Sequence, residues 1–211
     1  MLAGLDNERG WSADFEAGQA IGLSGTGGAV TLEPGGQLEL AAKPRSDLHE
    51  VARDTRNFQS AVERVGGQLG LTFFAMGLLP LQTQAQIPTM PKGRYQIMKR
   101  VMPTLGSRSL EMMFTTATVQ TNLDYSSEAD MTRKFRVAAC LSPIVAALFA
   151  NAPYQGGKPS GRMTERYAIW DDTATDRSGR FGWFLERPVT YAFYAAWAAQ
   201  QQMFFIRRDE V

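Results

Sequence analysis

Apolar residues recur every three or four positions between residues 46 and 65, the spacing of one face of an amphipathic helix. That face consists of Leu48, Val51, Ala52, Thr55, Phe58, Ala61, Val62 and Val65. Ser46 or Asp47 can cap the N-terminus of this helix, and Gly66 and Gly67 can end it. The spacing therefore predicts a helix over 46–65 that packs one face on the core.

Further helices and loops follow from the same kind of pattern. A basic helix is predicted over 93–101, and an apolar helix over 191–199. Ser126 or Ser127 caps a helix from 128 to about 150, with a kink expected at Pro143. Residues 151–180 are rich in glycine, proline and polar side chains and predict a long ordered loop.

Strands are predicted where apolar stretches are short and bounded by glycine or proline. Residues 19–41 predict short strands joined by glycine turns, and the apolar runs 71–80 and 203–207 predict a buried strand and a final strand. Gly25, Gly27 and Gly28 resemble a phosphate-binding loop, but the lysine and hydroxyl spacing of a P-loop is missing. A hairpin turn is therefore predicted there.

Polar and apolar residues alternate strictly from Thr118 to Tyr125. Such alternation predicts a strand that turns one face to the core and the other to a polar environment. The polar face would consist of Thr118, Gln120, Asn122 and Asp124, and we interpret it as the floor of a pocket.

The predicted strands and helices do not alternate regularly along the chain. This order predicts an α+β fold with a largely antiparallel sheet and helices packed on one face.

Composition narrows the chemistry. The chain has 211 residues, 22 basic and 21 acidic side chains, and a net charge of +1, which argues against nucleic acid and membrane surfaces as partners. Its single cysteine, Cys140, lies in an apolar run and is predicted to be buried and reduced. His49 is the one histidine and is predicted to be solvated. Acid–base or metal chemistry must therefore rely on other residue types, and Mg²⁺ is the metal that suits oxygen ligands.

Several segments resemble the glutamate–cysteine ligase family of the plant and proteobacterial type, in the order and approximate spacing of that family. The segments are "LEPGGQLEL" (32–40), "PTMPKGRYQIMKRVMP" (88–103), "LEMMFTTATVQTNLDYSSEADMTRKFRV" (110–137), "ALFANAPYQGGKPSGRMTERYAIWDDT" (147–173) and "MFFIRR" (203–208). The resemblance implies a glutamine-synthetase-like fold with a curved sheet. It also implies ATP- and Mg²⁺-dependent ligation of the γ-carboxylate of glutamate to cysteine, the first step of glutathione biosynthesis.

The resemblance also implies roles for individual residues. It assigns Glu39, and less directly Glu33, to the metal, and Lys158 to phosphate. Arg94, Tyr95 and Arg166 match substrate-binding residues, with Arg166 holding glutamate. Gln120 and Asn122 are the residues expected to face the reacting phosphate and γ-carboxyl groups, as catalytic residues.

Two family segments rich in glutamate are missing, so the chain resembles the central part of a ligase, and we expect a single, incomplete catalytic domain over residues 1–211. Alternative readings remain: a remnant that binds glutamate or nucleotide without turnover, a chain whose site is completed by a homodimer or a partner chain, or a carboxylate–amine ligase that uses another amine. The expected partners are small molecules, namely glutamate, cysteine and ATP. The lack of a leader-like or membrane-spanning segment predicts a cytoplasmic location.

Overall fold

A computed structural model describes residues 1–25 and 27–206, apart from the side chains of residues 7–9. The chain divides into two compact units. The first consists of Met1–Ala75 and Ile87–Gln96, and the second of Met76–Gln86 and Ile97–Val211. The single domain expected over residues 1–211 stays a prediction.

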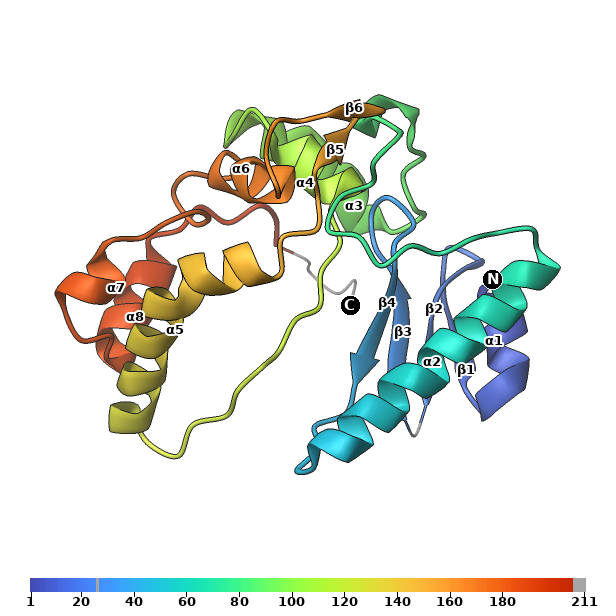
Figure 1. Cartoon of the computed structure of the whole chain (residues 1–211), viewed down its shortest axis with the longest axis horizontal. Coiled ribbons are helices and arrows are strands. Elements are labelled where there is room, and N and C mark those ends of the chain that lie inside the picture. Colours follow the sequence, from blue (N-terminus) through green and yellow to red (C-terminus); the bar gives the residue numbers. More distant parts are fainter. Residues whose placement is uncertain (26, 207–211) are drawn as a thin grey trace. The chain divides into compact units, whose positions relative to one another are not determined.

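The first unit contains an antiparallel sheet of four strands in chain order (Figure 1). The strands are β1 (Ser12–Glu16), β2 (Gln19–Gly25), β3 (Gly28–Leu32) and β4 (Leu38–Ala42). Gly25 pairs with Gly28 at the end of the β2–β3 hairpin, where φ of Gly28 is +128°. The predicted hairpin at this glycine cluster is thus confirmed for its described residues, and so are the α+β class and the antiparallel pairing.

Two helices supply the rest of the core of the first unit. Helix α1 (Leu2–Arg9) and helix α2 (Leu48–Gln68) pack against strands β2 and β3, and α2 crosses the sheet in Figure 1. The buried cluster consists of Leu2, Leu5, Leu23, Val30, Ala61, Val62 and Val65. Asp47 caps α2 by accepting a hydrogen bond from the backbone N–H of His49, whose side chain is exposed as predicted. The helix predicted over 46–65 is therefore confirmed, and it ends three residues later than expected.

Helix α3 (Gly93–Val101) begins in the first unit and continues in the second. The second unit then adds η2 (Met102–Thr104) and α4 (Ser109–Thr115), with η1 (Gln84–Gln86) earlier in the chain. Helix α4 packs beside α6 (Glu165–Asp171), which follows the two-residue strands β5 (Tyr154–Gln155) and β6 (Lys158–Pro159). Leu78, Ala152 and Ile169 form a small buried cluster between these elements.

A second group of helices in this unit is held together by aromatic side chains. Helix α5 (Glu128–Leu148) lies beside α7 (Trp183–Glu186), and α8 (Tyr191–Ala199) joins them (Figure 1). Seven rings pack edge to face or tilted, as aromatic pairs prefer; they belong to Phe135, Phe181, Trp183, Phe184, Phe193, Tyr194 and Trp197. Ser127 caps α5, so the predicted cap is confirmed.

Several local predictions are wrong. Residues 71–80 and 118–125 are not strands: the first segment makes one isolated bridge, at Leu78, and the second is an extended segment without a partner strand among the described residues. Residues 203–206 also form no strand, and residue 207 lies outside the described residues. The loop predicted over 151–180 contains β5, β6 and helix α6. Cys140 is exposed rather than buried, because the apolar run around it lies on an uncovered side of α5.

Among the described residues, no helix is both long enough and apolar enough to cross a membrane.

Candidate functional site

Tyr95 is the centre of the candidate site in the first unit. Its ring is almost completely buried, and its hydroxyl lies 2.9 Å from the carbonyl oxygen of Leu32 and 3.4 Å from Oε2 of Glu33. The first turn of α3 is thereby attached to the end of strand β3. Burial, together with the nearby Glu33 carboxylate, raises the pKa of the Tyr95 phenol, so the hydroxyl stays protonated.

Two cations flank this tyrosine. Lys92 Nζ lies 3.4 Å from the Tyr95 hydroxyl and 5.3 Å from the ring centroid, and Arg94 Nη2 donates to the same hydroxyl at 3.2 Å. The Arg94 guanidinium carbon is 5.0 Å from the ring centroid, within the range of a cation–π contact. Neither cation forms an ion pair with a carboxylate of the described residues. Arg94 and Tyr95, both predicted as substrate-binding residues, are thus brought into direct contact.

The two predicted metal ligands lie on the same side of the sheet. Glu39 on β4 pairs across the strands with Thr31 on β3, and directly opposed residues point to the same face. The Thr31 hydroxyl donates to Oε1 of Glu33 at 3.0 Å. Carboxylate oxygens suit Mg²⁺. However, no group of three or more metal-binding side chains occurs in the described part of the chain. These two glutamates would therefore need other oxygen ligands to complete a magnesium shell.

Arg166 on helix α6 is the predicted glutamate-binding residue, and it lies in the second unit. Its Nε is buried and has no hydrogen-bond partner in the described part of the chain, and its guanidinium carbon lies 5.4 Å from the centroid of the Trp170 ring. Gly77 leaves room for the stem of this side chain, since a Cβ at position 77 would lie 3.2 Å from Cδ of Arg166. Burial lowers the pKa of the guanidinium group, and no ion pair with a described residue offsets that cost. Arg166 is thus a partly buried cation that lacks an anion among the described residues.

A network of charged side chains surrounds the neighbouring residue Glu165. Arg108 binds Glu165 through Nη1 at 2.6 Å and Glu111 through Nε and Nη2 at 3.1 and 2.6 Å. Arg162 Nη1 donates to the other oxygen of Glu165 at 2.9 Å, and Gln155 donates to Glu111 at 2.6 Å. These bonds join α4, β5 and α6, so the network fixes the helix that carries Arg166.

Because of this network, protonation of Glu165 at acidic pH should lower the stability of the chain. Burial alone would raise the pKa of Glu165, but the hydrogen bonds from Arg108 and Arg162 outweigh it, and the pKa falls below its ordinary value of 4.5. The contribution to stability is therefore complete above pH 4.5 and is lost as the pH falls through the lower folded-state value. Denaturant unfolding between pH 7 and pH 3 should show a smaller loss of stability for Glu165→Gln than for the parent chain. Equal losses would contradict the assignment.

Gln120 and Asn122 belong to an extended segment of the second unit. Both are exposed, and Gln120 Nε2 donates to Oδ1 of Asn122 at 3.0 Å. Hydrogen bonds hold this segment near its two ends: the backbone N–H of Ala117 donates to the carbonyl of Gly77, and Lys134 Nζ on α5 donates to the carbonyl of Asp124. The interpretation of residues 118–124 as a pocket floor is therefore wrong, because no strand of the described residues pairs with the segment. The predicted phosphate-binding residue Lys158 is also exposed, beside the turn that joins β5 and β6.

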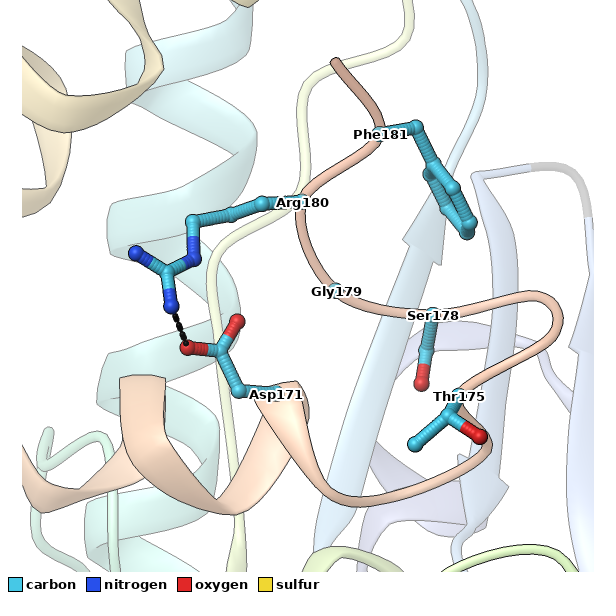
Figure 2. A pocket seen from close by; sticks show the side chains of 6 residues that line it. All are labelled: Asp171, Thr175, Ser178, Gly179, Arg180 and Phe181. Atoms are coloured by element: carbon cyan, nitrogen blue, oxygen red, sulfur yellow. Dashed lines mark ion pairs between the residues drawn. The ribbon is translucent and has the colours of Figure 1, made fainter. Parts of the chain in front are cut away.

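A polar hollow of about 260 Å³ occurs elsewhere in the second unit (Figure 2). It is lined by Asp171, Thr175, Ser178, Gly179, Arg180 and Phe181, and includes none of the predicted site residues. An ion pair of 2.9 Å joins Arg180 to Asp171 (Figure 2). Because its two charges already neutralise each other, the hollow is a weaker candidate for an ionic ligand than Arg166.

The predicted set of residues omits some of the groups described above. Lys92 is not among the predicted site residues, although it lies only two residues before Arg94 in sequence. Trp170 lies one helical turn after Arg166, a spacing at which two side chains of a helix meet, and this could have identified the pair. No local signal links Arg108 and Glu165, which are far apart in the sequence.

The chain was compared with known proteins. The model of Glutamate-cysteine ligase family 2 (GCS2) matches residues 8–210. The chloroplastic glutamate–cysteine ligase of Medicago truncatula is 41% identical over 210 residues, which are 100% of this chain and 41% of that protein. The chloroplastic glutamate–cysteine ligase B of Oryza sativa subsp. japonica is 40% identical, with 100% and 42% covered. The Brassica juncea enzyme is 42% identical over 199 residues, with 94% and 39% covered.

These comparisons bear on the predicted location of the protein and on how much of a ligase the chain represents. The predicted cytoplasmic location is wrong, because the relatives are named as chloroplastic proteins. That prediction rested on the lack of a leader-like segment in a sequence that matches only part of each relative. The chain spans about two fifths of the length of the relatives that it matches. A match over residues 8–210 and about 40% identity along the whole chain leave one assignment: this chain belongs to glutamate–cysteine ligase family 2.

Proposed function

We propose that the chain takes part in the ATP-dependent ligation of glutamate to cysteine, and that Arg166 binds a carboxylate of the glutamate. The observation that carries this proposal is the Arg166 side chain, whose Nε is buried without a partner among the described residues. A guanidinium group presents two parallel N–H donors that match the two oxygens of a carboxylate. A carboxylate ligand would supply the anion that this cation lacks.

In the proposed reaction, a γ-carboxylate oxygen of glutamate attacks the γ-phosphorus of ATP, and ADP leaves. The amine of cysteine then attacks the acyl carbon, and phosphate leaves as the amide forms. The reactants carry negative charge, so positioning and neutralisation are the main tasks of the protein. Arg166 in the second unit, and Arg94 held by Tyr95 in the first, are the cations that we assign to these tasks.

We also propose the remaining roles on the basis of family resemblance. Glu39 and Glu33 would bind Mg²⁺ together with phosphate and water oxygens, and the ion would supply charge neutralisation at the phosphates. Lys158 would contact phosphate. Gln120 and Asn122 remain proposed catalytic residues, although both are exposed in this structure. A glutamine-synthetase-like arrangement of the sheet belongs to the same proposal.

The proposal is tested by incubating the full chain with ATP, Mg²⁺, glutamate and cysteine. We expect γ-glutamylcysteine, measured by liquid chromatography, with phosphate release that requires both amino acids. Product with other amines in place of cysteine would identify a related carboxylate–amine ligase. Calorimetric binding of glutamate without any product would favour a chain that binds substrate but needs a partner chain for turnover. Absence of both binding and product would contradict the proposal.

A further inference from the structure

Lys92 is a buried lysine in the first unit, and only 7% of it is exposed. Burying an ammonium group is costly unless an opposite charge or good hydrogen bonds compensate. In direct contact with Lys92 Nζ, the described residues place the Tyr95 hydroxyl at 3.4 Å and the face of the Tyr95 ring. Both are neutral, so no described carboxylate forms an ion pair with this buried ammonium group.

The carboxylates around Lys92 have other partners. Glu33 accepts from the Thr31 hydroxyl through one oxygen and lies within reach of the Tyr95 hydroxyl through the other. Glu16 accepts a hydrogen bond of 2.7 Å from the backbone N–H of Gly93. These glutamates and Glu39 raise the pKa of Lys92 from a distance, but burial and the neighbouring Arg94 act more strongly, and the net pKa is lowered. The surroundings of Lys92 therefore favour an added negative charge.

Tyr95 keeps the two cations side by side. Its hydroxyl is close to Lys92 Nζ and Arg94 Nη2 at the same time, at 3.4 and 3.2 Å. Two positively charged donors that share one acceptor atom can also reach the oxygens of one small anion, since charged hydrogen bonds to oxygen span about 2.7–2.9 Å. Repulsion between two neighbouring cations would fall when such an anion binds.

We propose that Lys92 and Arg94 form an oxyanion-binding pair that takes one phosphate or carboxylate group, with Tyr95 as the positioning residue between them. The identity of the natural ligand, a group of ATP or of an amino acid, rests on the proposed function. The existence of the oxyanion-binding pair does not. The alternative is that Lys92 is purely structural and stabilises Tyr95 through its contact with the ring. The two interpretations predict different effects on anion binding and thermal stability when Lys92 is replaced by a neutral side chain.

The variant Lys92→Met keeps an unbranched apolar stem and removes the charge. Lys92→Arg keeps the charge, and Lys43→Met removes an exposed lysine from the same unit as a matched control. Inorganic phosphate and glutamate are titrated separately into the full chain at low salt, and binding is followed by calorimetry. We expect Lys92→Met to weaken binding of at least one of them about 10- to 100-fold, as removal of a charged hydrogen bond does. Lys92→Arg should stay within a few-fold of the parent chain, as should Lys43→Met.

Thermal unfolding of the ligand-free variants separates the two readings of Lys92. Replacing an unpaired buried charge with an apolar side chain should leave the melting temperature unchanged or raise it. A lower melting temperature for Lys92→Met with unchanged anion affinity would overturn the oxyanion-binding pair, as would a parent chain that binds neither probe. Loss of phosphate binding points to the nucleotide as the source of the anion, and loss of glutamate binding points to the amino acid. An anion affinity that depends on Lys92, in a chain that forms no γ-glutamylcysteine, would retain the pair and favour a chain that binds substrate without turnover of its own.

Discussion

Replacing Arg166 with methionine should lower the affinity of the chain for glutamate on the order of a hundredfold, because two charge-assisted hydrogen bonds to one carboxylate are lost. The side chain is held in place by α6, by the Trp170 ring and by the space beside Gly77. Calorimetric titration of glutamate into the variant and the parent chain measures the effect. Arg166→Lys should recover only part of the affinity, because an ammonium group cannot bind a carboxylate in the forked geometry.

Arg162 provides the matched control for this experiment. It is also an arginine near the start of α6, but it pairs with Glu165 at 2.9 Å and its side chain is mostly exposed. Arg162→Met should leave the glutamate affinity within a factor of about three, since the Arg162 side chain is mostly exposed and Arg108 still pairs with Glu165. Equal losses for the two variants would mean that Arg166 supports the fold and does not touch the ligand.

Arg108→Met should have the largest effect on stability. Arg108 makes three hydrogen bonds to two carboxylates, and Glu165 is only 4% exposed. Removing one partner of a buried ion pair leaves the other charge without full compensation, which typically lowers the free energy of unfolding by about 3 kcal/mol. Arg162 would still neutralise one oxygen of Glu165, so the loss should lie at the lower end of the usual range. Denaturant unfolding measures the change.

Arg133→Met serves as the control for the loss of an arginine as such. Arg133 lies 3.7 Å from Asp130 on α5, and its side chain is largely exposed, so its loss should change the free energy of unfolding by less than about 0.5 kcal/mol. The double variant Arg108→Met/Glu165→Gln should be more stable than Arg108→Met alone, because it removes the uncompensated charge. If the double variant is not more stable, the charge of Glu165 is not stabilised by Arg108.

The helices were predictable from sequence because their signals are local. The apolar face of α2, its Asp47 cap and the Ser127 cap of α5 all lie within a few residues of the backbone groups that they affect. A strand differs from a helix because it needs a neighbouring strand for its hydrogen bonds, and the local sequence does not show whether such a neighbour exists. Residues 118–125 have the right alternation, yet Val119 is 94% exposed, since no described strand lies beside the segment.

The candidate site was predictable only in part. Resemblance identified Arg94, Tyr95 and Arg166, and the structure explains what positions each of them. Spacing could not identify Lys92, because its importance depends on its burial and on the lack of an ion pair with any described carboxylate. The contact between Arg108 and Glu165 joins positions 57 residues apart, and no periodic pattern connects them.

The path of the chain between the two units affects how this protein can be divided. Residues 87–96 return to the first unit after an excursion into the second, and they bring Lys92, Arg94 and Tyr95 with them. A gene cut after Ala75 would therefore yield a sheet-bearing fragment without the tyrosine that bonds to Leu32 at the end of β3. A break at that point would separate the cations from their support, so the sheet and its cation pair stay together only in a chain that continues through residue 96.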